Sequence, residues 1–119
     1  MALSADGRHA LSGSLDRTLK LWDTESGALV RTFEGHSDSV NAVALNADGR
    51  RALSGSNDRT LKLWDTANGQ TVASFSAEAA INGCALSMSR PPLLVAGDQS
   101  GRMYFLRLID PHSEPVSND

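Results

Sequence analysis

The feature that most constrains this chain is an internal repeat of 42 residues. Residues 2–23 return as residues 44–65 with only three differences. These are Ser4/Asn46, His9/Arg51 and Leu15/Asn57. An eroded third copy follows, because residues 96–106 can be laid over residues 54–64 at the same spacing. Such a chain is predicted to fold as a stack of similar units, each burying its apolar surface against its neighbours.

Within each unit the hydrophobic pattern has the period of a β-strand. In the second unit Val40, Ala42 and Ala44 alternate with residues that are also mostly apolar, as in a strand covered on both faces. Asp48-Gly49 and Asn68-Gly69 predict tight turns, because these residue types tolerate the positive φ that such turns require. Together with a turn at Asn57-Asp58, the pattern predicts about four short strands per unit and an all-β fold.

Four-stranded units at this period are typical of β-propeller blades. The second unit also contains a Gly-His pair, a small hydroxyl residue, an aspartate and a Trp-Asp pair. These are Gly35-His36, Ser54, Asp58 and Trp64-Asp65, with 27 residues between His36 and Trp64. In these residues the chain resembles the WD-repeat family, and the resemblance covers residues 2–108. It implies a partial WD-repeat β-propeller of about 2.7 four-stranded antiparallel blades.

The expected blades follow one another along the chain. Residues 1–36 are a first blade with a truncated inner strand, and residues 37–78 are a complete second blade. Residues 79–109 are a degenerate terminal blade that lacks its outer strand. Residues 110–119 are polar, contain two prolines and are expected to be a disordered tail.

The resemblance also implies a role for the polar residues of the motif. In the family, the histidine, hydroxyl residue, aspartate and tryptophan of a blade form a buried hydrogen-bond network. The complete set here is His36, Ser54, Asp58 and Trp64, and an incomplete set in the first blade is Ser12, Asp16 and Trp22. The third blade is expected to have lost the network, since Ser100 replaces the aspartate and Leu106 the tryptophan.

A serine, a histidine and an aspartate could also suggest a hydrolase triad. The structural role is favoured, because the set recurs in consecutive units and no nucleophile is singled out. The chain has no P-loop, and its histidines lack metal-ligand spacing. We therefore expect no catalytic residue, no cofactor and no metal.

A candidate interaction surface follows from the positions that face the top of a propeller in the family, since loops on a rigid scaffold concentrate binding residues. It consists of Leu15 in the first unit, Ser39, Asn41 and Asn57 in the second, and Asn82 and Gln99 in the third. The Leu15/Asn57 difference is what a partner-reading surface would show, although drift explains it equally well.

Composition narrows the class of partner. The net charge is only −3, and Lys and Arg form no cluster, which argues against nucleic acid and against a membrane surface. A single cysteine and the absence of a signal peptide favour a cytoplasmic setting. The leading hypothesis is a non-catalytic protein-interaction scaffold or sensor module, forming the C-terminal part of a larger WD-repeat protein.

An alternative rests on residues 96–108, which resemble the last blade of propellers in bacterial signalling NTPases of the AP-ATPase and NACHT type. The chain would then be a regulatory propeller whose catalytic domain lies upstream. In either case the unpaired edges and apolar faces of an incomplete ring predict contacts with missing blades, with other proteins or with a second copy.

Overall fold

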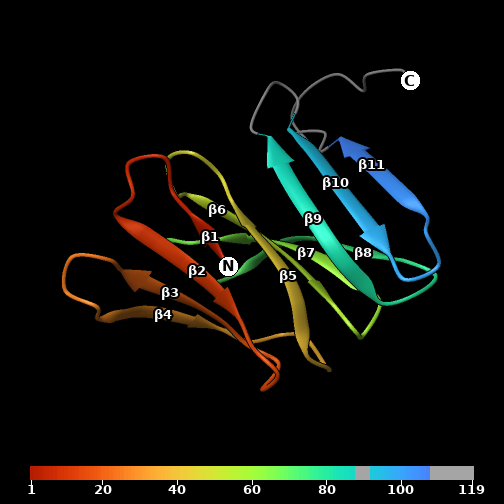
Figure 1. Ribbon diagram of the computed structural model, residues 1–119, viewed down its shortest axis with the longest axis horizontal. Coiled ribbons are helices and arrows are strands. Elements are labelled where there is room, and N and C mark those ends of the chain that lie inside the picture. Colours follow the sequence, from red (N-terminus) through yellow and green to blue (C-terminus); the bar gives the residue numbers. More distant parts are fainter. Residues whose placement is uncertain (88–91, 108–119) are drawn as a thin grey trace.

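Residues 1–87 and 92–107 are described by the computed structural model, and the regular elements among them are all β-strands. Eleven strands form three antiparallel sheets that follow one another along the chain (Figure 1). The prediction of an all-β fold is confirmed. Within the described residues, no helix has the length and apolar character needed to cross a bilayer. The expected tail, residues 110–119, lies outside the described residues.

Each sheet is a simple meander in which a strand pairs with the next one along the chain. The first sheet contains β1 (Ala2–Leu3), β2 (His9–Gly13), β3 (Leu19–Asp23) and β4 (Leu29–Phe33). The middle sheet contains β5 (Val40–Leu45), β6 (Arg51–Ser56), β7 (Thr60–Asp65) and β8 (Thr71–Ser76). The third sheet, as far as it is described, contains β9 (Ile81–Ser87), β10 (Leu93–Asp98) and β11 (Met103–Arg107).

The two faces of the middle sheet carry different rows of side chains, because successive residues of a strand point to opposite faces. We call Ala44, Leu53 and Leu63 its forward row; they are cross-strand partners and pack toward the third sheet. We call Leu45, Ala52 and Trp64 its rear row; they are also cross-strand partners and pack toward the first sheet. Forward and rear rows recur in the other two sheets at the equivalent registers.

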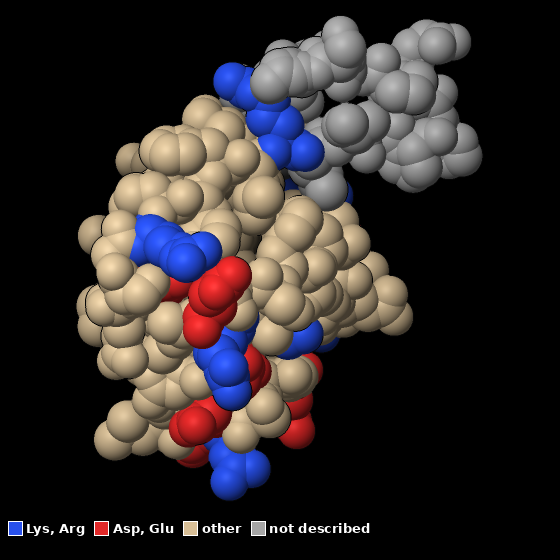
Figure 2. All heavy atoms as spheres, turned by 90° about the vertical axis from the view of Figure 1, so that its right-hand side faces the viewer, with Lys and Arg blue, Asp and Glu red and all other residues tan. Residues whose placement is uncertain are grey.

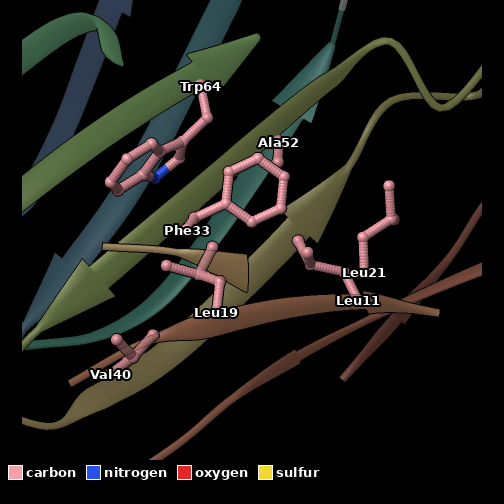
Figure 3. Packing of buried hydrophobic residues seen from close by; sticks show 7 residues of the cluster. All are labelled: Leu11, Leu19, Leu21, Phe33, Val40, Ala52 and Trp64. Carbon is pink, nitrogen blue, oxygen red and sulfur yellow. The ribbon is translucent and has the colours of Figure 1, made fainter. Parts of the chain in front are cut away.

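The two junctions between sheets both place a forward row on a rear row. At the first junction Leu11 and Leu21 lie in one cluster with Ala52 and Trp64 (Figure 3). Ala2 and Leu45 pack against this cluster. At the second junction the forward row of the middle sheet packs against Leu86, Leu94 and Leu106. Burying each large apolar side chain contributes about 1.5–3 kcal/mol. The sheets are therefore held mainly by face-to-face packing.

Two glycines allow the sheets to approach closely. A Cβ added to Gly13 would lie 2.7 Å from the Val40 side chain, and one added to Gly55 would overlap the Ile81 side chain. Val40 and Ile81 each open the first strand of the following sheet. A larger residue at either glycine would push the next sheet away, so the repeat keeps glycine at both positions.

Candidate functional site

The polar residues of the middle sheet form one continuous hydrogen-bond chain beneath the surface. The indole N–H of Trp64 donates to Ser54 Oγ at 2.8 Å, and Ser54 Oγ lies 2.6 Å from His36 Nε2. His36 Nδ1 lies 2.9 Å from Asp58 Oδ2. The structure thus brings together the four residues that the sequence grouped, from strands β6 and β7, the turn between them and the loop before β5.

The direction of each hydrogen bond follows from the two residues at the ends of this network. The Trp64 indole can only donate, and the Asp58 carboxylate can only accept. His36 therefore carries its proton on Nδ1, and the Ser54 hydroxyl donates to His36 Nε2. Burial lowers the pKa of His36 from its ordinary value, against the opposite influence of the Asp58 carboxylate, so the ring is neutral near pH 7.

The Asp58 carboxylate is held by several donors besides His36. The backbone N–H of Ser37 donates at 3.0 Å, the N–H of Thr60 donates at 2.9 Å, and the Thr60 hydroxyl also donates to it. Burial alone would raise the pKa of Asp58, but these hydrogen bonds outweigh it and hold the pKa well below its ordinary value. Asp58 thus fixes the loop before β5 to the β6–β7 turn.

The Ser54, His36 and Asp58 contacts have the connectivity of a hydrolase triad, yet the serine cannot meet a substrate. Ser54 is 0% exposed, and its oxygen accepts a hydrogen bond from the Trp64 indole N–H. Trp64 and Phe33 close over the site with ring centroids 5.6 Å apart. The geometry is that of a buried structural network. We call the hydrogen bonds that join Trp64, Ser54, His36 and Asp58 the link of the middle sheet.

The first sheet keeps only part of the link. Trp22 donates to Ser12 Oγ at 3.0 Å, as Trp64 does to Ser54. Asp16 is exposed and does not join this pair; it accepts hydrogen bonds from Thr18 and Lys20 within its own turn. Those bonds, with the Thr18 hydroxyl first, hold the pKa of Asp16 well below its usual range.

In place of the His–Ser–Asp–Trp set, the third sheet has a different network, which is centred on Asp98. Asp98 is buried and accepts from the Ser100 N–H and hydroxyl at 2.9 and 2.6 Å, and from Tyr104 Oη–H at 2.8 Å. The Tyr104 oxygen in turn accepts the backbone N–H of Glu78 at 3.2 Å. The carboxylate of this network is not at Ser100, the position equivalent to Asp58, but two residues earlier.

Three of the proposed surface residues form a polar ring at one end of the middle sheet. Asn41 Nδ2 donates to Asn57 Oδ1 at 2.6 Å, and Asn57 Nδ2 donates to Ser39 Oγ at 2.8 Å. Ser39 Oγ donates back to Asn41 Oδ1 at 3.4 Å. Asn41 and Asn57 are exposed, whereas Ser39 is only 6% exposed. Ser39 therefore supports the two asparagines from below rather than facing solvent itself.

The other proposed surface residues lie at the corresponding end of the neighbouring sheets (Figure 1). Leu15 is 87% exposed in the β2–β3 turn, and Asn82 and Gln99 are exposed at the start of β9 and in the β10–β11 turn. Asn41 Nδ2 also donates to the backbone oxygen of Ile81 at 3.1 Å, which ties the middle sheet to the third. Leu15, Asn41, Asn57, Asn82 and Gln99 form what we call the rim.

Residues 1–87 and 92–107 contain no cluster of three His, Cys, Asp or Glu side chains that could hold a metal ion. The polar groups singled out by the sequence therefore divide into two kinds. His36, Ser54, Asp58 and Trp64 bond to one another inside the molecule, and the rim faces solvent.

Stacked antiparallel sheets at this repeat, with a Trp–Ser–His–Asp chain between them, define WD-repeat propeller blades. Two family descriptions match the sequence: "TEP-1 C-terminal beta-propeller" over residues 36–108 and "WD domain, G-beta repeat" over residues 1–23. The resemblance to WD-repeat propellers is therefore confirmed. The longer match covers more than half of the chain, and the protein belongs to the TEP-1 C-terminal β-propeller family.

Individual proteins are similar over shorter stretches. Dynein assembly factor with WD repeat domains 1 of Homo sapiens is 50% identical over 44 residues, which make up 37% of this chain and 11% of that protein. U3 snoRNP-associated protein-like YAOH of Oryza sativa subsp. japonica is 41% identical over 44 residues, which make up 37% of this chain and 9% of that protein. The chain thus spans only a small part of each of these curated relatives.

A solved structure shares the fold over most of the chain. The β-propeller domain of Cps50 (Swd1) from Myceliophteria thermophila superimposes with a TM-score of 0.82 at 22% sequence identity. The superposition covers 92% of this chain and 35% of that chain. At this level of identity the likeness concerns the fold.

Proposed function

We propose that the chain is a non-catalytic protein-interaction module and that the rim is its partner-binding surface. The observation that carries the proposal is the division of the polar groups between the buried link and the rim. The Ser–His–Asp set is enclosed, whereas the rim residues stand at one end of all three sheets, on turns fixed by backbone hydrogen bonds and at the starts of strands β5 and β9. Residues displayed by loops on a rigid scaffold are typical of binding surfaces.

The chemistry of the rim favours a protein partner. Its exposed groups are amides and one leucine, which can hydrogen-bond to a peptide backbone and bury an apolar side chain. Asn41 and Asn57 are held in one arrangement by Ser39, so less conformational entropy is lost when they bind. WD-repeat propellers generally act as such scaffolds, and this supports the same conclusion.

The test compares two triple variants of equal charge. The rim variant carries Leu15→Lys, Asn57→Lys and Gln99→Lys. The control carries Ala5→Lys, Ala47→Lys and Ala67→Lys, at exposed residues in turns at the opposite ends of the strands. Proteins captured from an extract by the wild-type chain and by each variant are quantified by mass spectrometry.

At least one captured protein should bind the control as it binds the wild type and bind the rim variant roughly tenfold less, which corresponds to about 1.4 kcal/mol. If the two variants lose the same proteins to the same extent, the rim is not the binding surface.

A second prediction is that the chain is a regulatory propeller of a bacterial signalling NTPase. It is based on the resemblance of residues 96–108 to the last blade of such propellers. An ATP-binding P-loop in the same polypeptide would support it, whereas further WD repeats alone would favour the scaffold.

A further inference from the structure

The junction between the middle and third sheets contains a cavity of about 110 Å³ that is partly open to solvent. It lies inside the stack, between β7 and β8 on one side and β9, β10 and β11 on the other. Its lining is mostly apolar and includes Leu61, Phe75, Ile81, Ala96, Tyr104 and Leu106. Both walls belong to the described residues, so the cavity is distinct from the outer faces of the stack.

The cavity lies where the Trp64 ring stands at the first junction. Three lining residues take the positions of residues that are buried in one cluster with Trp64: Leu61 that of Leu19, Phe75 that of Phe33 and Ile81 that of Val40. Leu106 takes the position of Trp64 itself, on the third strand of its sheet. Leucine is smaller than tryptophan, and a core relaxes only partly around a smaller side chain. The cavity is therefore the space that a tryptophan at position 106 would fill.

The cavity does not depend on the absence of a fourth strand beside β11. At the first junction the same place belongs to a complete four-stranded sheet. The cluster around Trp64 there contains residues of β1 to β7 and, within the described part of the chain, none of β8. A strand added beyond β11 would take the position of β8, so it should leave the cavity unfilled.

The wall of the cavity offers an occupant few free hydrogen-bonding groups. Ala96 stands where the middle sheet has Ser54, which accepts the hydrogen bond of the tryptophan indole. The Tyr104 hydroxyl is already engaged, since it donates to Asp98 and accepts from the Glu78 N–H. A donor placed in the cavity would therefore lack a partner, at a cost in affinity.

The surroundings of the cavity favour a neutral occupant. Among the described residues that line it, none is a Lys, Arg, Asp or Glu. On the side of the molecule that carries the third sheet, these four residue types form a narrow band beside broad areas of other residues (Figure 2). An ion would lose its hydration in such a cavity without gaining a counter-charge.

The first junction shows which group fits the space. There the Phe33 and Trp64 ring centroids lie 5.6 Å apart with an interplanar angle of 63°, which is an edge-to-face contact. Phe75 can offer the same contact at the second junction. An apolar cavity of about 150 Å³ binds benzene, so the smaller cavity here has room for one ring at most. We propose that the cavity binds a small neutral molecule with a single aromatic ring and no hydrogen-bond donor.

The sequence holds no aromatic side chain that could serve instead. Every Phe, Trp and Tyr of residues 1–119 lies in the described part of the chain, and none of them fills the cavity. A bound ring would contact both sheets of the second junction, as the Trp64 ring does at the first. The ligand should therefore also stabilise the folded chain.

The test is NMR of the isotope-labelled full chain during a titration with benzene. Leu106→Trp fills the cavity, and Ala96→Ser supplies an acceptor with little change in volume. Val30→Trp is the control, since it adds the same ring at a residue that is 50% exposed on β4 and does not line the cavity. Circular dichroism checks the fold of each variant.

Benzene should shift the amide signals of residues around the cavity in the wild type and the control, with a Kd on the order of 1 mM for so small a ligand. Leu106→Trp should bind benzene about tenfold more weakly, because its own ring occupies the space. Pyrrole, which carries an N–H donor, should bind the wild type about tenfold more weakly than benzene does. In Ala96→Ser this difference should disappear, because the added hydroxyl accepts the N–H as Ser54 does for Trp64.

A wild type that does not respond to benzene would overturn the proposal, and so would an equal response of Leu106→Trp. If Leu106→Trp does not fold, Ala96→Ser decides: an unchanged preference for benzene over pyrrole would show that neither molecule sits in the place of the Trp64 ring. Equal shifts with cyclopentane, which is apolar but not aromatic, would contradict the class of ligand. None of these outcomes depends on the rim, so the proposed function is tested separately.

Discussion

The middle and third sheets fasten the loop before their first strand with different residues. In the middle sheet the backbone N–H of Ser37 donates directly to the Asp58 carboxylate. In the third sheet the N–H of Glu78 donates to the Tyr104 hydroxyl, which donates to the Asp98 carboxylate. In both sheets a loop amide is thereby tied to a carboxylate near the turn between the second and third strands. The attachment of the loop to the sheet is therefore present in both sheets, although different side chains make it.

The difference also shows what the histidine adds. In the middle sheet His36 continues the link from Asp58 to Ser54 and Trp64, so the loop is tied both to the turn and to the face of the sheet. The third sheet has Ala96 and Leu106 at the positions of Ser54 and Trp64, and its link ends at the carboxylate. The stability of the middle sheet should therefore depend more strongly on its buried polar residues than the stability of the third sheet does.

The largest expected effect comes from Trp64. Replacing it by Ala removes a ring that is 1% exposed and the N–H that donates to Ser54 Oγ, which should cost about 3–5 kcal/mol of unfolding free energy. Trp22→Ala should cost about half as much, because Trp22 is only half-buried. Urea titrations measure both. Equal losses would contradict the different burial of the two rings.

Asp58→Ala should have the next largest effect. It strands the N–H groups of Ser37 and Thr60 and the ring N–H of His36, at about 1–3 kcal/mol for each donor that water cannot reach. Asp48→Ala is the matched control, since Asp48 also accepts from the N–H two residues on but is exposed. Its cost should stay within about 0.5 kcal/mol. Similar midpoints in urea would count against the buried link.

Acid should weaken the middle sheet through His36. Its pKa is lower in the folded chain than its ordinary value of 6.5, so between the two values the unfolded state binds more protons. The contribution of His36 is complete above pH 6.5 and is lost as the pH falls toward the folded value. Melting midpoints should therefore fall between pH 7 and pH 5. His36→Asn should flatten this slope, and an unchanged slope would assign the acid sensitivity to other groups.

The smallest effect is expected from Tyr104→Phe, which removes only the hydroxyl that joins Glu78 to Asp98. The melting midpoint should fall less than for Asp58→Ala, because Tyr104 ties a single loop amide. A double-mutant cycle with Asp98→Asn measures the coupling. If the two changes add independently, the third sheet has no such link.

The sequence predicted the sheets because identical residues recur at a fixed spacing, and it predicted the hydrogen-bond network of the middle sheet through the resemblance to the WD-repeat family. Leu53 and Leu63, or Ser54 and Trp64, occupy the same registers as their copies in the first unit. The third link was missed because a comparison by position looks for the carboxylate at Ser100. Asp98 instead stands where the middle sheet has Ser56, and Tyr104 stands where it has Lys62.

The burial of Ser39 was missed for a different physical reason. The pairing of β5 with β6 is irregular between Val40 and Ala42, where one extra residue bulges out. A bulge breaks the strict alternation of inward and outward side chains. Ser39 and Asn41 therefore do not share the exposure that a regular strand would give them, and no residue type in the sequence marks the irregularity.

The protonation of His36 tests the account most directly, because the His36 ring joins Ser54 to Asp58 in the hydrogen-bond network of the middle sheet. Nitrogen-resolved NMR of the histidine side chains, with His36→Asn for assignment, reports which ring nitrogen carries the proton. We predict a neutral ring with a slowly exchanging proton on Nδ1 and no titration between pH 8 and pH 6.5. A ring protonated on Nε2, or one that titrates at about pH 6.5 as an exposed histidine does, would contradict the buried link between Trp64 and Asp58.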